Sequence, residues 1–101
     1  MLRDKNILFV DDQAEILILL EKILEGEEYG KFFTSSVEGA RKIIETEKIN
    51  ALVTDLIMPD VSGLFLLEEV KLNHPDIVRI VLSGHSQIPA ILSAINRGDI
   101  W

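Results

Sequence analysis

Four short apolar runs, each as long as a β-strand, recur along the chain and are separated by segments with helical periodicity. The runs are Ile7–Val10, Phe32–Thr34, Ala51–Thr54 and Val78–Leu82. β-Branched and aromatic residues are frequent in them, as is typical of strands. The first, third and fourth runs are almost continuously apolar instead of alternating with polar residues. This pattern indicates strands that are buried on both faces of a parallel sheet.

The segments between the runs have the spacing of amphipathic helices, with apolar residues three and four positions apart. The first segment, Ala14–Leu24, is apolar on most sides, and its length and flanking glutamates favour a helix. The apolar faces of the other segments are Val37, Ala40, Ile43 and Ile44, then Leu64, Leu67 and Val70, and finally Ile88, Ile91, Leu92 and Ile95. Alternation of strand and helix predicts an α/β fold with a doubly wound parallel sheet and right-handed crossovers.

Several polar and glycine residues stand where helices should begin or end. Ser35 with Glu38 has the spacing of a capping box before the second helix. Ser62 is placed to cap the third helix, and Gly26 stands where the first helix should end. These signals support the predicted helix boundaries.

The composition limits the class of protein. With 101 residues the chain has room for one domain with one core, which we place at residues 1–101. Its 17 acidic and 10 basic residues give a net charge of −7, which argues against direct binding of nucleic acid. No apolar run approaches the ~20 residues of a membrane span. The chain has no cysteine, which excludes disulfides and fits a cytoplasmic protein.

Carboxylates and a hydroxyl follow the predicted strands. Asp11 and Asp12 come after the first run, Asp55 after the third, and Ser83 with Gly84 after the fourth. Ligands of open α/β sheets bind beyond the carboxyl ends of the strands, so we expect these residues to converge on one edge. Close carboxylates repel each other by roughly a few kcal/mol per pair. Mg²⁺ would offset this repulsion and bridge to a phosphate oxygen, which suits phosphoryl transfer to a carboxylate.

Each of these residues also has a purely structural interpretation. Asp12 with Glu15 has the spacing of a capping box, so Asp12 could serve only to begin the first helix. Asp55 could be a turn residue, and the hydroxyl of Ser83 could belong to an ordinary turn. Their joint placement at successive strand ends is what favours a shared site.

Three stretches of the chain carry a resemblance to a known family. They are Val10-Asp11-Asp12, then Val53 to Asp60 followed by Ser62-Gly63, and Leu82-Ser83-Gly84-His85. In these stretches the chain resembles the receiver domains of two-component response regulators, and the resemblance runs along its whole length. It implies a flavodoxin-like (βα)5 fold, a regulatory function in a cytoplasmic phosphorelay, and no enzymatic activity beyond self-phosphorylation and self-dephosphorylation.

The resemblance also implies a role for individual residues. Asp55 would be the phosphoacceptor, and Ser83 the switch hydroxyl that moves toward the phosphoryl group. Asp12 would bind Mg²⁺ directly, Asp11 would act mostly through a coordinated water, and Ile57 would give its backbone carbonyl to the metal. The phosphoryl group would come from a sensor histidine kinase, and an output domain outside this chain would respond.

The chain departs from the family pattern at its end. The family places a lysine at the end of a fifth strand, whereas this chain stops at Trp101, shortly after Gly98. Lys71 lies within the third predicted helix and cannot take that role. We therefore expect a truncated receiver that lacks most of the fifth strand and the last helix. Its open edge at Val78–Leu82 predicts a homodimer, in one form through exchange of a terminal element.

Rival functions fit the residues less well. Haloacid dehalogenases need a second acid two residues after the acceptor aspartate, where this chain has Ile57. A dinucleotide-binding fold requires a glycine-rich turn after the first strand, where the chain has two aspartates. His74 and His85 are expected to have no functional role. A receiver-shaped interaction module without a working switch remains the alternative.

Overall fold

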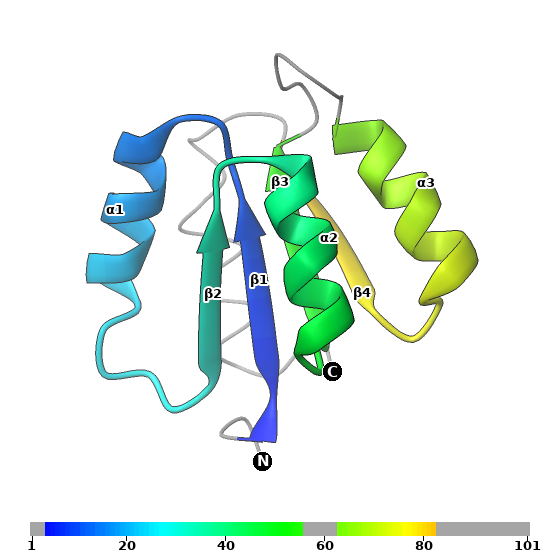
Figure 1. Cartoon of the computed structure of the whole chain (residues 1–101). Coiled ribbons are helices and arrows are strands. Elements are labelled where there is room, and N and C mark those ends of the chain that lie inside the picture. The colour runs from blue at the N-terminus through cyan, green and yellow to red at the C-terminus, as the bar shows by residue number, and fades with distance from the viewer. Residues whose placement is uncertain (1–3, 56–62, 83–101) are drawn as a thin grey trace.

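The computed structural model describes residues 4–55 and 63–82, which form a β-sheet flanked by helices (Figure 1). The elements in chain order are β1 (Asn6–Val10), α1 (Ala14–Ile23), β2 (Gly30–Thr34), α2 (Val37–Thr46), β3 (Ala51–Asp55), α3 (Gly63–Asn73) and β4 (Val78–Leu82). The four predicted strands and the first three predicted helices are confirmed. The predicted fourth helix lies outside the described residues. Among the described helices, none is long and apolar enough to cross a membrane.

The four strands form one parallel sheet in the order β2-β1-β3-β4. Val10 at the end of β1 is level with Thr34 of β2 and Thr54 of β3. Asp55 at the end of β3 is level with Leu82 of β4. Because β1 and β3 are hydrogen-bonded neighbours in this register, the residues that follow β1 meet the end of β3.

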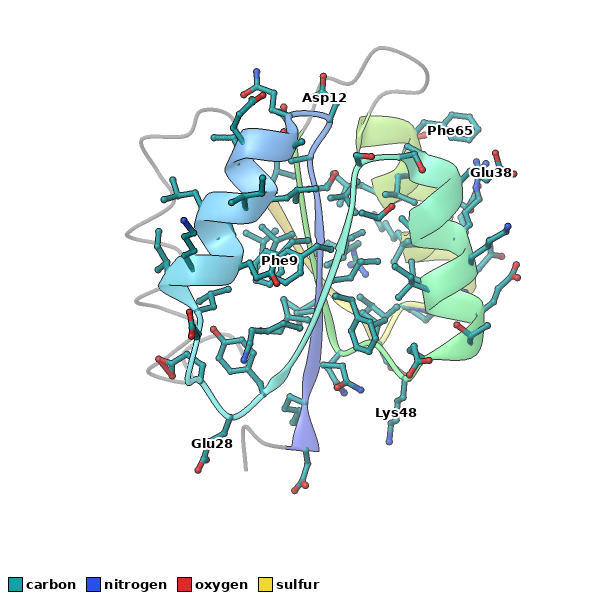
Figure 2. The ribbon with its side chains drawn as sticks, turned by 60° about the vertical axis from the view of Figure 1, so that its left-hand side comes forward. Phe9, Asp12, Glu28, Glu38, Lys48 and Phe65 are labelled. Atoms are coloured by element: carbon teal, nitrogen blue, oxygen red, sulfur yellow. The ribbon has the colours of Figure 1, made fainter. Side chains whose placement is uncertain are left out.

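The two faces of the sheet are covered by different helices, as the turned view in Figure 2 shows. Ile7 and Phe9 of β1 pack on one face in a core that includes Leu20 and Leu24. The alternate residues of β1 pack on the opposite face with residues of α2 and α3, including Leu8, Val10, Val37, Ala40, Leu66, Leu67 and Val70. Both faces of β1 are therefore buried, which explains why its sequence is continuously apolar.

The N-terminal cap of α2 differs from the prediction by one residue. Ser36 is the capping residue, and its hydroxyl accepts a hydrogen bond from the Gly39 backbone N–H at 3.0 Å. Because the cap is Ser36, the predicted capping box of Ser35 with Glu38 is wrong. The strand β2 continues through Thr34, and Ser36 still has an extended backbone, so the first helical residue is Val37.

The boundaries of α1 also refine the prediction. The helix begins at Ala14 after Gln13 as the N-terminal cap, and it ends at Ile23 with Leu24 as the C-terminal cap. Gly26 has a φ of 92°, a left-handed backbone conformation in which glycine avoids the steric penalty of a Cβ. Gly26 thus lies shortly after the end of the helix, close to the helix end that the sequence predicted. Ser62, the predicted cap of α3, lies outside the described residues.

Tyr29 precedes β2 and is almost fully buried beside Phe9 and Leu24. Burial, with a further contribution from Glu27, raises the pKa of Tyr29 to about 12. In the unfolded chain the pKa of tyrosine is near ~10. The folded protein therefore holds a proton that the unfolded chain loses between these two pH values.

We expect Tyr29, the one tyrosine of the chain, to titrate near pH 12 in the folded protein. Its contribution to the free energy of unfolding, roughly 2–3 kcal/mol, is complete below about pH 10 and is lost as the pH rises through about 12. Tyrosinate absorbance measures the midpoint, which should return to ~10 in urea. Equal midpoints in native buffer and urea would contradict this prediction.

Candidate functional site

Three carboxylates meet at the carboxyl edge of the sheet, as the strand ends predict. Asp11, Asp12 and Asp55 each place a carboxylate oxygen within 4.8 Å of the oxygens of the other two. Asp11 and Asp12 directly follow β1, and Asp55 is the last residue of β3. Figure 2 shows Asp12 between the end of β1 and the beginning of α1. The expected convergence of these three residues is thus confirmed.

The three carboxylates have different environments. Asp11 is only 1% exposed, Asp55 is half-buried, and Asp12 is exposed to solvent. The Asp11 carboxylate accepts a hydrogen bond from the Gln13 backbone N–H at 2.9 Å. The Asp11 backbone N–H donates to the Thr34 carbonyl at 3.2 Å. Asp11 is therefore an anchored inner group, whereas Asp12 forms the open side of the cluster.

Asp12 does not have the position of a helix cap. The capping residue of α1 is Gln13, and its side chain makes no capping hydrogen bond. The carboxylate that bonds to the backbone at this helix start belongs to Asp11. The capping interpretation of Asp12 is thus not supported, and Asp12 remains available for a ligand.

Two threonines that the sequence analysis did not single out form hydrogen bonds with the backbone of Asp11 and Asp55. Thr54 is fully buried at the end of β3, and its hydroxyl donates to the Asp55 carbonyl at 3.0 Å. Thr34 ends β2 and accepts the hydrogen bond from Asp11. A hydroxyl at the end of an otherwise apolar strand was the signal that could have indicated Thr54.

The structure does not place all of the remaining predicted residues. Ile57, Ser83 and His85 fall outside the described residues. His74 follows α3 and lines a groove with Asn50, beside the first residues of β3 and β4, so it lies at the opposite end of the sheet from the carboxylates. Its expected lack of a role in the site agrees with this position.

The carboxylate cluster fits a hard divalent cation. Within the described ranges, neither Asp12 nor Asp55 forms a salt bridge with a basic residue. The cluster offers only oxygen donors, with one carboxylate open to solvent, and Mg²⁺ prefers such a set together with water. The three side chains could therefore hold Mg²⁺.

Replacing Asp12 with asparagine should separate metal binding from stability. Removing one negative charge relieves repulsion, so without divalent cations the free energy of unfolding should rise by about 1 kcal/mol, the lower end of the Coulomb estimate because Asp12 is exposed. The same change should weaken Mg²⁺ binding. Urea unfolding in EDTA and calorimetric Mg²⁺ titration measure the two effects, and lower stability in EDTA would contradict the repulsion.

The fold and the carboxylate cluster together define a class of protein. Residues 7–99 match the sequence profile of the response regulator receiver domain. The chain therefore belongs to the receiver domain family of response regulators, which are regulatory domains of two-component phosphorelay signalling.

Particular relatives are similar along most of the chain. The hydrogenase transcriptional regulatory protein HoxA of Cupriavidus necator is 30% identical over 99 residues, covering 98% of this chain and 20% of that protein. The nitrogen assimilation regulatory protein NtrX of Azorhizobium caulinodans is 34% identical over 95 residues, covering 92% of this chain and 21% of that protein. The chain thus spans about a fifth of the length of these curated relatives.

A solved structure supports the fold assignment. The response regulator protein TrrA of Thermotoga maritima, crystallised in complex with Mg²⁺-BeF, is 30% identical, with a TM-score of 0.73. The alignment covers 91% of this chain and 80% of that chain. The predicted receiver fold is therefore confirmed.

Proposed function

We propose that the domain accepts a phosphoryl group from a sensor histidine kinase onto Asp55, in a reaction that requires Mg²⁺. The observation that carries this proposal is the half-buried Asp55 carboxylate at the end of β3, grouped with the Asp11 and Asp12 carboxylates within 4.8 Å. The Mg²⁺ in the structure of the TrrA relative also supports it. Acceptance of the phosphoryl group would switch the conformation of the domain.

Asp11 and Asp12 would contribute to Mg²⁺ binding in different ways, according to their exposure. Asp12 is the open group and would bind Mg²⁺ directly, while the anchored Asp11 would act mostly through a coordinated water. In the family pattern, the Ile57 carbonyl and the Ser83 hydroxyl complete the site. Mg²⁺ held by these residues would neutralise negative charge on the phosphoryl oxygens.

Asp55 itself would act as the nucleophile. One of its carboxylate oxygens forms a bond to phosphorus while the bond between phosphorus and the imidazole nitrogen of the kinase breaks. The buried Thr54 hydroxyl on the Asp55 carbonyl holds the backbone of this residue. The nucleophile therefore stands on a fixed strand end, and positioning of this kind contributes strongly to phosphoryl transfer.

The partners of the domain follow from the same proposal. The HoxA and NtrX relatives are regulatory proteins about five times as long as this chain, and HoxA is a transcriptional one, which supports an output domain in a longer protein. The homodimer stays a prediction. Its support is that β4 is an outer strand of the described sheet and that Val81 on it is exposed. Light scattering that shows a monomer at high concentration would contradict the dimer.

Incubation with acetyl phosphate and Mg²⁺ tests the main proposal. We expect a mass gain of one phosphoryl group that survives acid and is removed by hydroxylamine, as an acyl phosphate requires. EDTA should prevent the gain. An acid-labile label, or one that forms equally in EDTA, would contradict the proposal and favour the interaction module without a switch.

A further inference from the structure

We propose that Thr34 and Gly39 act together as positioning residues that hold Asp11 in place for Mg²⁺ binding, although neither belongs to the carboxylate cluster. Thr34 ends β2, and Gly39 lies in the first turn of α2. This inference rests on the proposed function, because it assigns a role in the same metal site. It connects the packing of α2 to the geometry of the carboxylates.

The first step is a close contact between α2 and the end of β2. A Cβ at Gly39 would overlap the Thr34 Oγ1 and would lie 3.3 Å from the Thr34 Cβ and 3.0 Å from the Ser36 Oγ. Real Cβ atoms do not approach a neighbour as closely as this overlap requires. The first turn of α2 can therefore rest on the Thr34 side chain only because residue 39 is glycine.

Helix stability alone does not explain this glycine. Glycine within a helix costs roughly 0.5–1 kcal/mol relative to alanine, because it loses more conformational freedom on folding. The Gly39 N–H is satisfied by the Ser36 hydroxyl, a bond that any residue with a backbone N–H could make. The feature that requires glycine is the absence of a side chain facing Thr34.

The second step leads from Thr34 to Asp11. The Thr34 carbonyl accepts the Asp11 backbone N–H at 3.2 Å, one residue beyond the last strand pair, Val10 with Thr34. Asp11 is buried, and its carboxylate is held on its other side by the Gln13 N–H. A shift of the end of β2 would therefore move the backbone of Asp11, and its carboxylate would move with it.

Thr34 has little freedom to absorb a larger neighbour. Its side chain is β-branched, so few χ1 rotamers are favourable, and only one of the three staggered rotamers would turn a hydrogen atom instead of the hydroxyl or the methyl group toward residue 39. Its hydroxyl also accepts the Ser36 N–H at 3.4 Å, which ties it to the turn before α2. Added volume at position 39 should therefore displace backbone.

The test is a double-mutant cycle read by Mg²⁺ affinity. Mutation of residues that orient metal ligands without binding the metal typically lowers metal affinity by about 10–100-fold. We therefore expect Gly39→Ala to weaken Mg²⁺ binding roughly 10-fold. Thr34→Ala removes the obstructing hydroxyl, so the double variant Thr34→Ala/Gly39→Ala should bind within about twofold of Thr34→Ala alone. Calorimetric titration gives each dissociation constant, and urea unfolding in EDTA gives each stability.

Lys42→Ala provides a control for the presence of an alanine on the same helix, because Lys42 is exposed. It should leave Mg²⁺ affinity unchanged. If Gly39→Ala does not fold, Thr34→Val tests the contact more mildly, since a methyl group replaces the hydroxyl that faces Gly39. We expect this variant to bind Mg²⁺ roughly threefold more weakly, below the ~10–100-fold range of groups that orient metal ligands, because it adds no atom at residue 39.

Each outcome distinguishes the inference from the proposed function. Wild-type Mg²⁺ affinity in Gly39→Ala, or in Thr34→Val where that variant is used, shows that the contact is only structural and overturns the inference. If Gly39→Ala weakens Mg²⁺ binding and Thr34→Ala/Gly39→Ala binds Mg²⁺ much more weakly than Thr34→Ala alone, the effect of residue 39 does not act through Thr34. This outcome also overturns the inference. A wild-type protein that binds no Mg²⁺ contradicts the proposed function itself, before any variant is compared.

Discussion

Asp55→Asn is expected to reduce phosphoryl labelling by acetyl phosphate to background. Asparagine has nearly the same shape as aspartate, but its amide has no anionic oxygen and forms no acyl phosphate. The substitution also removes one charge from a cluster whose oxygens lie within 4.8 Å, so the fold should be at least as stable without metal. Intact-protein mass spectrometry before and after hydroxylamine measures the label.

Asp76→Asn is the matched control for this experiment. Asp76 is exposed between α3 and β4, and it lines the groove at the opposite end of the sheet from Asp55. Asp76→Asn is the same chemical change as Asp55→Asn. Because Asp76 lies away from the carboxylate cluster, this variant should label like the wild type. If Asp55→Asn labels as strongly as Asp76→Asn, Asp55 is not the acceptor. Unchanged unfolding curves for both variants would show that a lost label is not a lost fold.

Phe9→Ala is expected to produce the largest loss of stability. Phe9 is 1% exposed on β1, which lies between β2 and β3, and its ring stacks on Phe33 with centroids 5.2 Å apart. Removing a buried phenyl ring costs about 3–5 kcal/mol, because the surrounding side chains collapse only partly into the cavity. Domains of this size have a total stability of roughly 5–15 kcal/mol, so much of it would be lost.

Phe65→Ala makes the same chemical change on the surface. Phe65 lies on α3, is 53% exposed, and has the Arg41 guanidinium 6.0 Å from its ring. Its removal should cost about 1 kcal/mol or less, the range of exposed cation–π contacts. Urea unfolding followed by circular dichroism measures both variants. Equal losses for Phe9→Ala and Phe65→Ala would show that the core on the α1 face has been assigned wrongly.

Much of the fold could be predicted from local patterns. The near-continuous apolar runs indicated the strands and their parallel pairing, because a strand covered on both faces has no polar side to display. The carboxylate cluster could also be predicted, since parallel neighbours bring Asp11, Asp12 and Asp55 to the same edge. These conclusions depend on each residue's own burial or on its place at a strand end.

Local signals were less reliable where two neighbouring residues could serve the same purpose. Ser35 and Ser36 are both good caps, and only the structure shows, through the hydrogen bond from the Gly39 N–H, that Ser36 is the one used. Asp11 and Asp12 are adjacent and chemically identical, yet one is buried and bonded to the backbone while the other is exposed. Their sequence neighbours do not distinguish them.

The sequence by itself determined the strands, the first three helices and the edge at which the acidic residues meet, because periodicity and strand-end position are properties of each segment. Only the tertiary structure decided the strand order, the different burial of Asp11 and Asp12, and the contact of Gly39 with Thr34. Each of these depends on how segments pack against one another. A close approach between a helix and a strand end has no signature in the sequence of either segment.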